Sequence, residues 1–241
     1  MYNDNNYGFQ QNSASYGQAA QGLSYSQYLG RTFRWMTLGL LVTFAMSFAT
    51  AYTSLYYTAA MLYLPLTVIE LVLVFVLSAR VQKMQVGTAR ALFLAYSALN
   101  GMVLSFYFVQ FSASSLILAF LSSALYFGVM AVYGARTSRD LSGWGRKLMI
   151  ALVCMIVVSL IGMLFGMGFF MSMLYSAIGL GIFMLLTAYD TQKIQSYYRY
   201  YSADGAMLEK SAIFSALSLY LDFINIFLYV LRFVGVSRRN N

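Results

Sequence analysis

The chain of 241 residues is 61% hydrophobic and only 9% charged, with a mean hydropathy of +0.68. Soluble domains carry about 25% charged residues, so this composition predicts an all-α integral membrane protein rather than a soluble domain. The net charge of +8 does not indicate nucleic-acid binding, because the basic residues stand in short clusters between apolar runs. The chain has one cysteine, Cys154, and no histidine. The lack of histidine excludes zinc proteases and histidine-based proton relays.

The first 30 residues are rich in Gln, Asn, Ser, Tyr and Gly, and Asp4 is their only charge. This segment has neither a basic start nor an apolar core, so it is not a signal peptide. We therefore predict two regions: a disordered cytoplasmic tail over residues 1–30, and a transmembrane domain over residues 31–241.

From residue 31 onward, long apolar blocks alternate with short basic clusters. Three blocks are each about twice as long as the ~20 residues that one membrane helix needs, so each is predicted to be a helical hairpin. These blocks span residues 35–79, 91–135 and 148–189. Their outer turns are expected at residues 52–60, 110–115 and 166–170. A polar turn at 203–205 and a last apolar run over 211–231 complete seven transmembrane helices.

The basic residues also predict an orientation. The N-terminal flank and the three loops between the blocks hold 12 of the 15 Lys and Arg residues, and the outer turns hold none. Basic loops face the cytoplasm, so the N-terminus is expected inside and the C-terminus outside. Compact loops and the lack of an obvious retention signal favour a bacterial cytoplasmic (inner) membrane over an endoplasmic reticulum. Arg232, Arg238 and Arg239 would favour the inside, so a re-entrant last helix with six crossings is the alternative.

Two aspartates lie in the last two apolar segments. Asp190 closes a charge-free run that begins at Leu148, and Asp222 is the only charge within residues 211–231. Their midpoint is residue 206, beside the polar turn, so two antiparallel helices would place both carboxyl groups at a similar depth. Burying either carboxylate costs about 2.5–3.5 kcal/mol on insertion scales, and an ionisable residue in such a place is a functional-site hypothesis.

Both of these helices carry a continuous face of small and polar residues. On the last helix this face comprises Ser211, Ser215, Ser218, Asp222, Asn225 and Tyr229. On the preceding helix it comprises Ser172, Ser176, Gly179, Phe183, Thr187 and Asp190. A membrane helix turns such a face toward other helices or a wet cavity. Ordinary helix packing explains the serines and glycine but not the two aspartates.

Four other polar residues within or beside the apolar blocks are candidates for an ion path or its gate. Glu70 lies in the middle of VIELVLVF, Asn100 lies in SALNG, and Asn225 lies on the polar face of the last helix. Arg80 follows Glu70 by ten residues, about 15 Å along a helix. It is either an interfacial arginine that reaches toward water or a partner of the gate.

Five stretches of the chain carry a recognisable pattern: IELVLVFVLSARVQKM, TARALFLAYSALNGMVLS, AVYGARTSRDLSGWG, LLTAYDTQKI and ALSLYLDFINIFLYVLR. Together they resemble the transmembrane Bax inhibitor motif family (Bax inhibitor-1-like proteins), from about Arg31 to Arg232. The resemblance implies seven helices, arranged as three hairpins around a central C-terminal helix. For a bacterial member it implies a pH-sensitive calcium leak channel.

The same resemblance implies roles for individual residues. The aspartates of AYDTQKI and YLDFINIF, Asp190 and Asp222, match the pH-sensing pair of the family. Arg80 is the best match to an arginine that can pair with the first of these aspartates, and Glu70 matches an acidic residue associated with the ion path.

The physical chemistry of carboxyl groups is consistent with this mechanism. Calcium prefers oxygen ligands, so Asp190 and Asp222 are candidate transient ligands of calcium as the transported ion. Two carboxylates in contact cannot both ionise at low cost and titrate as a coupled pair. We hypothesise that a shared proton holds the two helices together and closes the path on the cytoplasmic side. Loss of the proton would leave repelling charges that a cation or Arg80 relieves. No tightly bound cofactor is expected.

Two other classes of function remain open. An intramembrane aspartyl protease of the presenilin type also has two late aspartates, the first in a Tyr-Asp pair like Tyr189-Asp190. However, Asp222 lacks the preceding Gly-x-Gly pattern, and Pro65 is not followed by Ala-Leu, so we expect no enzyme. The resemblance implies the second alternative, a regulatory interaction protein, because some bacterial relatives are linked to control of a membrane-bound AAA protease. The N-terminal tail would be suited to that role. A proton-coupled transporter would need the same protonatable pair as a channel.

Overall fold

The computed structural model describes residues 23–165 and 168–235. Eight α-helices and a 3-10 helix make up most of this described part. They are α1 (Tyr25–Ala51), α2 (Leu55–Met61), α3 (Tyr63–Arg80), η1 (Val81–Lys83), α4 (Val86–Gln110), α5 (Ala113–Arg136), α6 (Ser142–Phe165), α7 (Phe169–Tyr201) and α8 (Gly205–Val234). Every α-helix except the short α2 is long and apolar enough to cross a membrane. The predicted all-α membrane architecture with seven transmembrane helices is therefore confirmed.

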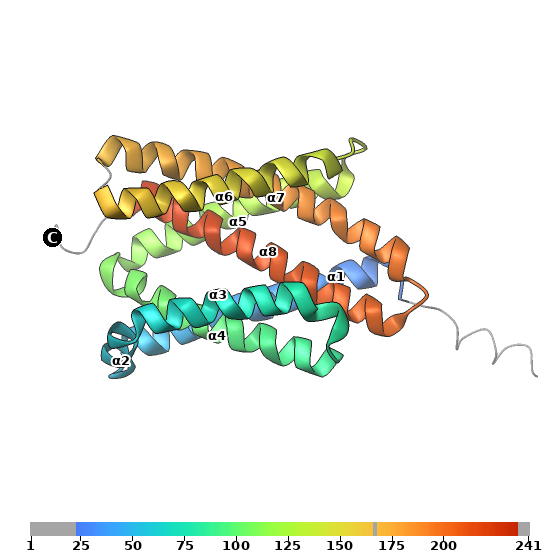
Figure 1. Cartoon of the computed structure of the whole chain (residues 1–241), viewed down its shortest axis with the longest axis horizontal. Helices are drawn as coiled ribbons and strands as arrows, with labels where there is room; N and C mark the ends of the chain where they lie inside the picture. Colours follow the sequence, from blue (N-terminus) through green and yellow to red (C-terminus); the bar gives the residue numbers. More distant parts are fainter. Residues whose placement is uncertain (1–22, 166–167, 236–241) are drawn as a thin grey trace, which may run out of the picture.

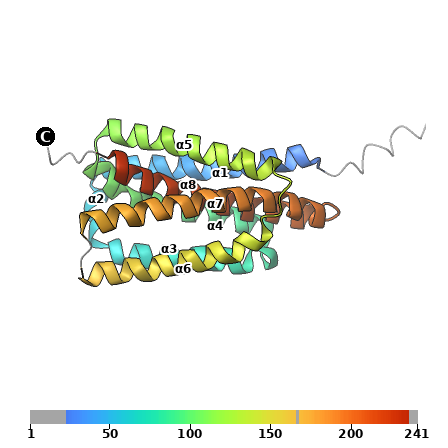
Figure 2. The ribbon, with the colours of Figure 1, turned by 90° about the horizontal axis from the view of Figure 1, so that it is seen from above.

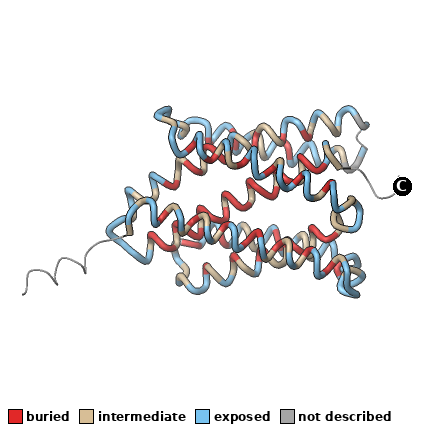
Figure 3. Tube along the Cα trace, turned by 180° about the vertical axis from the view of Figure 1, so that it is seen from behind, coloured by how far each residue is buried: buried red, intermediate tan, exposed pale blue. Residues whose placement is uncertain are grey.

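The last helix, α8, is central. Figure 1 shows it running between a group formed by α1, α3 and α4 and a group formed by α5, α6 and α7. Figure 2 places α1 and α5 at one face of the bundle and α3 and α6 at the opposite face. Buried positions follow α8 along most of its length (Figure 3). Its 30 residues form one unbroken helix of about 45 Å, which supports a full crossing rather than a re-entrant segment.

Aromatic side chains fix α8 to its neighbours. Phe223 packs against Phe120 and Phe127 of α5, with ring centroids 5.5 and 5.7 Å apart. Phe227 contacts Phe44 of α1 edge-on at 5.6 Å. The outer helices α3 and α6 instead expose much of their apolar surface, as Phe75 does at 70%. In a bilayer such surface faces lipid tails, which explains why these two helices are apolar on nearly every side.

The helices of different hairpins interleave around α8. The most extensive contacts of α1 are with α4, and α5 packs mainly against α7 and α8. Glycines permit these close approaches: a Cβ at Gly101 would lie 2.5 Å from the Thr43 carbonyl oxygen, and one at Gly134 would lie 2.1 Å from the Ala188 carbonyl oxygen. Only small residues allow two helix backbones to come so near.

The predicted turns agree with the structure in most places. The turns between α4 and α5 and between α7 and α8 lie where they were expected. The first outer turn, expected at 52–60, contains the additional short helix α2. The third, expected at 166–170, falls partly outside the described residues, because 166–167 are not among them.

The boundary between tail and transmembrane domain was predicted six residues too late, because α1 begins at Tyr25 rather than after residue 30. Ser24 caps the helix through a reciprocal pair of hydrogen bonds with Gln27, a strong start signal. Tyr28 is buried, and its hydroxyl lies 2.8 Å from that of Ser211 on α8. The remainder of the predicted tail, residues 1–22, lies outside the described residues.

The two ends of the bundle differ in charge. The start of α1, the α3–α4 turn, the α5–α6 loop and the α7–α8 turn all lie at the right-hand end in Figure 1. We call this the basic end. It comprises residues 23–34, 80–90, 136–147 and 193–210, which contain the 12 Lys and Arg residues of the N-terminal flank and the three loops. The described part of α8 finishes at the opposite end, as an odd number of crossings requires.

Candidate functional site between α7 and α8

The two polar faces predicted from the sequence meet in the structure. Toward the far end of the bundle, Gly179 of α7 leaves room for the ring of Tyr229, which a Cβ would approach to 2.4 Å. The Tyr229 ring also lies 6.0 Å from that of Phe183. Nearer the basic end, the same face of α7 presents Thr187 to α8. Small residues on α7 thus allow α8 to lie close alongside it.

Asp222 and Asp190 come together at this interface. Asp222 is only 3% exposed, while Asp190 is half-buried, and their carboxyl groups are close enough to interact electrostatically. The Thr187 hydroxyl interacts with the Asp222 carboxyl from the α7 side. The second carboxyl oxygen of Asp222, Oδ2, is buried without a hydrogen-bond partner in the described part of the chain. Most buried polar atoms are paired, so this oxygen calls for a functional explanation.

Arg80 does not pair with Asp190 in this structure, contrary to what the resemblance implied. Arg80 is exposed at the end of α3, and the two ion pairs among the described residues both use Glu209. The cation that interacts with Asp190 is Lys193, one turn later on α7. The physical reason is that α3 lies at the outside of the bundle and packs mainly against α4 rather than α7.

A second buried polar cluster lies on the other side of α8. The Asn100 amide donates a hydrogen bond to the Glu70 carboxyl, and the Asn100 side-chain oxygen accepts one of 3.0 Å from the Tyr220 hydroxyl. The Tyr220 hydroxyl also lies 2.7 Å from that of Thr43. Glu70 further interacts with the Tyr96 hydroxyl. This Glu70 cluster joins α3, α4, α8 and α1, and it brings together two of the three residues predicted for an ion path.

The third of these residues, Asn225, lies apart from the Glu70 cluster. It is half-buried, and its amide donates a 2.8 Å hydrogen bond to the Leu221 carbonyl oxygen of its own helix. One amide hydrogen of Asn225 is therefore bound within α8 rather than to another helix.

Sequence reasoning singled out neither Tyr220 nor Thr43. The sequence does indicate that Tyr220 and Asp222 point to opposite sides of the last helix, because residues two positions apart in a helix are separated by about 200° around its axis. Consequently α8 turns Asp222 toward α7 and Tyr220 toward α1 and α4. The two polar clusters therefore lie on either side of a single turn of α8.

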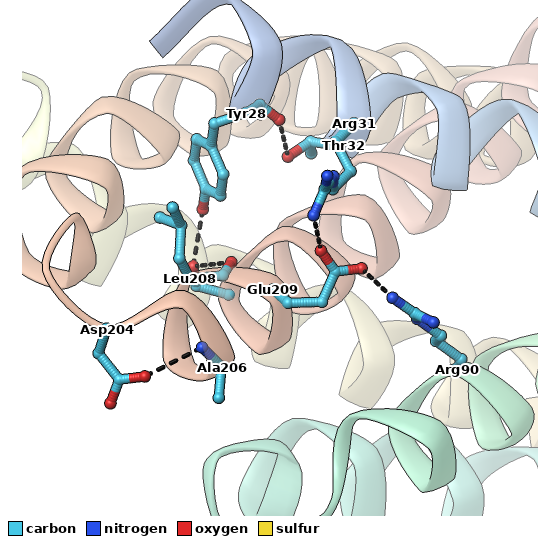
Figure 4. Close-up of polar contacts among 9 residues, drawn as sticks. Tyr28, Arg31, Thr32, Arg90, Asp204, Ala206, Leu208 and Glu209 are labelled. Carbon is cyan, nitrogen blue, oxygen red and sulfur yellow. Dashed lines mark hydrogen bonds and ion pairs between the residues drawn. The ribbon is translucent and has the colours of Figure 1, made fainter. Parts of the chain in front are cut away.

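The basic end contains an ion-pair cluster that the sequence did not predict either (Figure 4). Glu209 at the start of α8 pairs with Arg31 of α1 and with Arg90 of α4, the latter at 2.7 Å. The Glu209 side chain is only 8% exposed. The Arg90 guanidinium also lies over the Trp35 ring, 5.4 Å from its centroid. Glu209 thereby connects the N-terminal part of α8 to α1 and α4.

The described helices lie within a region that is similar to a known protein family. A family model described as "Inhibitor of apoptosis-promoting Bax1" matches residues 25–240. The chain belongs to the Bax inhibitor-1 family. The match begins at Tyr25, the residue at which α1 begins.

Two bacterial relatives support the assignment to the Bax inhibitor-1 family. "Inner membrane protein YbhL" of Escherichia coli strain K12 is 39% identical over 217 residues, which cover 88% of this chain and 92% of YbhL. An uncharacterized membrane protein of Streptococcus pyogenes serotype M1 is 37% identical over 226 residues, covering 91% of this chain and 96% of that protein. This family member is therefore a multi-pass membrane protein.

Proposed function

We propose that this family member is a pH-sensitive calcium leak channel, gated by Asp190 and Asp222 between α7 and α8. The observation that carries the proposal is the buried Asp222 carboxyl, which lies beside Asp190 and has one oxygen without a hydrogen-bond partner among the described residues. Helix packing alone does not require a carboxyl group there, and placing one in a membrane is costly. A group retained at such a cost is expected to bind or move an ion.

The gating step follows from the chemistry of two adjacent carboxyl groups. When they share one proton, a hydrogen bond between them holds α7 against α8 and keeps the path closed. When that proton is lost, the two negative charges repel each other across the helix interface. A calcium ion relieves this repulsion, because it prefers oxygen ligands and carboxylates strengthen its binding. Calcium is here the transported ion, held transiently by Asp190 and Asp222.

The Glu70 cluster is proposed as a further part of the ion path. It is buried in the membrane-spanning region and carries a third carboxyl group, that of Glu70, which is only 8% exposed and lies on the opposite side of α8. Because Tyr220 and Asp222 belong to the same turn of α8, movement of that turn would act on both clusters.

We further propose that the basic end faces the cytoplasm of a bacterial inner membrane, with the N-terminus on that side. The clustering of Lys and Arg at this end supports the orientation, and the printed name of the Escherichia coli relative supports the membrane. We propose no catalytic reaction, since the site carries two carboxyl groups suited to ion binding.

The experiment that tests the proposal is calcium flux into dye-loaded liposomes that contain the purified protein, measured between about pH 6 and about pH 8. Asp190→Asn and Asp222→Asn should each alter the pH profile. Asp204→Asn is the matched control, because Asp204 caps α8 outside the site and asparagine caps a helix equally well. Flux at the level of empty liposomes for every protein and pH would overturn the leak-channel proposal.

A further inference from the structure

Lys193 occupies an aromatic cage beside the aspartate pair. Its ammonium lies 5.6 Å from the ring centroid of Tyr189, 5.4 Å from that of Tyr197 and 5.7 Å from that of Phe214. The ammonium also donates a hydrogen bond to the Tyr197 hydroxyl. Two of these rings belong to α7 and the third to α8, so the cage bridges the same two helices as the pair. Aromatic faces attract such a cation electrostatically.

The cage holds the ammonium near Asp190 without letting the two pair directly. Asp190 precedes Lys193 by three residues, a spacing that brings side chains of a helix within about 5–6 Å of each other. The two groups interact electrostatically, yet the ion pairs of the described residues are those of Glu209. A positive charge therefore lies next to the carboxyl group, while no ion pair of the described residues occupies the carboxyl oxygens.

The cage also adjoins a place for water. A small cavity of about 60 Å³ is lined by Tyr197 and Phe214 of the cage, and by Ser78 and Val81 at the end of α3 and the start of η1. It is partly polar and large enough for water. Water in this cavity would lie beside two of the rings that hold the Lys193 ammonium.

The groups around the pair leave Lys193 as the nearby positive charge. The groups that interact with Asp190 or Lys193 in the described part are Tyr189, Tyr197 and Asp222, on α7 and α8. The α5–α6 region contributes Arg139 to a cavity of about 200 Å³ that Tyr189 of the cage also lines, and Asp140 lies in the same lining beside Arg139.

We propose that Lys193 is a fixed competitor of the transported calcium ion at Asp190, which keeps the affinity of the aspartate pair for calcium low. Ion conduction requires a site that binds strongly enough for entry and weakly enough for exit. Two carboxyl groups in a buried interface would otherwise hold a divalent cation tightly. The inference rests on the proposed function for its physiological meaning, but cation affinity can be measured without flux.

The test compares Lys193→Met with Lys193→Arg in the full-length protein in detergent micelles. The probe is terbium, which replaces calcium at oxygen ligands and emits light when a nearby tyrosine is excited; Tyr189 and Tyr197 can serve as donors. The site's signal is identified by its loss in Asp190→Asn, and calcium is then titrated against it. Lys147→Met is the control, because the Lys147 ammonium also lies over an aromatic ring, 5.7 Å from the Trp144 centroid, on α6.

Removing the positive charge in Lys193→Met should increase calcium affinity at least about tenfold. This is the repulsion between a unit charge and a divalent ion about 6 Å apart at the dielectric constant of water, expressed as a change in affinity. Lys193→Arg and Lys147→Met should keep the wild-type affinity. If Lys193→Met does not fold, Lys193→Gln carries the same expectation.

The results separate this inference from the proposed function. Unchanged affinity in the neutral variants, or no binding by them at all, overturns the inference even if the wild type conducts calcium. Tighter binding without flux from any protein supports the role of Lys193 and overturns the leak channel.

Discussion

Replacing Glu209 with alanine tests whether the central helix is tied down at the basic end. The Glu209 side chain is 8% exposed and accepts hydrogen bonds from Arg31 and Arg90. Hydrogen bonds to charged groups contribute about 1.5–3 kcal/mol each, and breaking a fully buried ion pair costs about 3–5 kcal/mol. The two arginine side chains are 33% and 43% exposed, so water can solvate them after the change. This lowers the expected loss of stability to about 2 kcal/mol.

Such a loss corresponds to a decrease of roughly 4–8 °C in the apparent Tm of a chain of this size. The assay is thermal unfolding in detergent, followed by tryptophan fluorescence at one heating rate. Arg31→Ala should lose less than Glu209→Ala, because it leaves Glu209 paired with Arg90. Arg34→Ala is the matched control, since Arg34 is exposed on the same helix. An unchanged Tm for Glu209→Ala, or an equal loss for Arg34→Ala, would refute the reasoning.

Two further substitutions test the packing around α8 and α7. Gly134→Ala should lower the stability of the fold by about 1–3 kcal/mol, because its Cβ would lie 2.1 Å from the Ala188 carbonyl oxygen. Gly128→Ala is the control: its Cβ has open space, so the substitution should be neutral or stabilising in the same thermal assay. Tyr220→Phe should lower the stability of the fold by about 1–3 kcal/mol, because it leaves the buried Asn100 side-chain oxygen without the Tyr220 donor. A Tm equal to that of the wild type would contradict the importance of that hydrogen bond.

The sequence predicted those features that depend on composition and spacing along the chain. Long apolar runs predicted the number of crossings, and the midpoint at residue 206 predicted that Asp190 and Asp222 lie at a similar depth. Period and length determine these features locally, because a membrane helix must be apolar and about 20 residues long. The start of α1 lies within the segment predicted as a tail, because residues 25–30 share its polar composition, although Ser24 and Gln27 form a capping box.

The contacts between helices distant in the chain could not be read from the sequence. In the sequence Glu209 is one of several charges before the last apolar run, and only the fold reveals that Arg31 and Arg90 converge on it. The aromatic cage of Lys193 could not be read from the sequence either, because its Phe214 ring comes from the next helix. The packing of α3 against α4, which separates Arg80 from Asp190, likewise depends on how the hairpins interleave.

The central claim is that the two aspartates make calcium flux sensitive to pH. The most direct measurement is the pH profile of calcium flux for the double variant Asp190→Asn/Asp222→Asn in liposomes, beside the wild type and Asp204→Asn. We predict that flux through the double variant no longer varies with pH, while Asp204→Asn keeps the wild-type profile. A double variant whose flux still follows the wild-type pH profile would contradict the claim, because the sensor would then lie elsewhere.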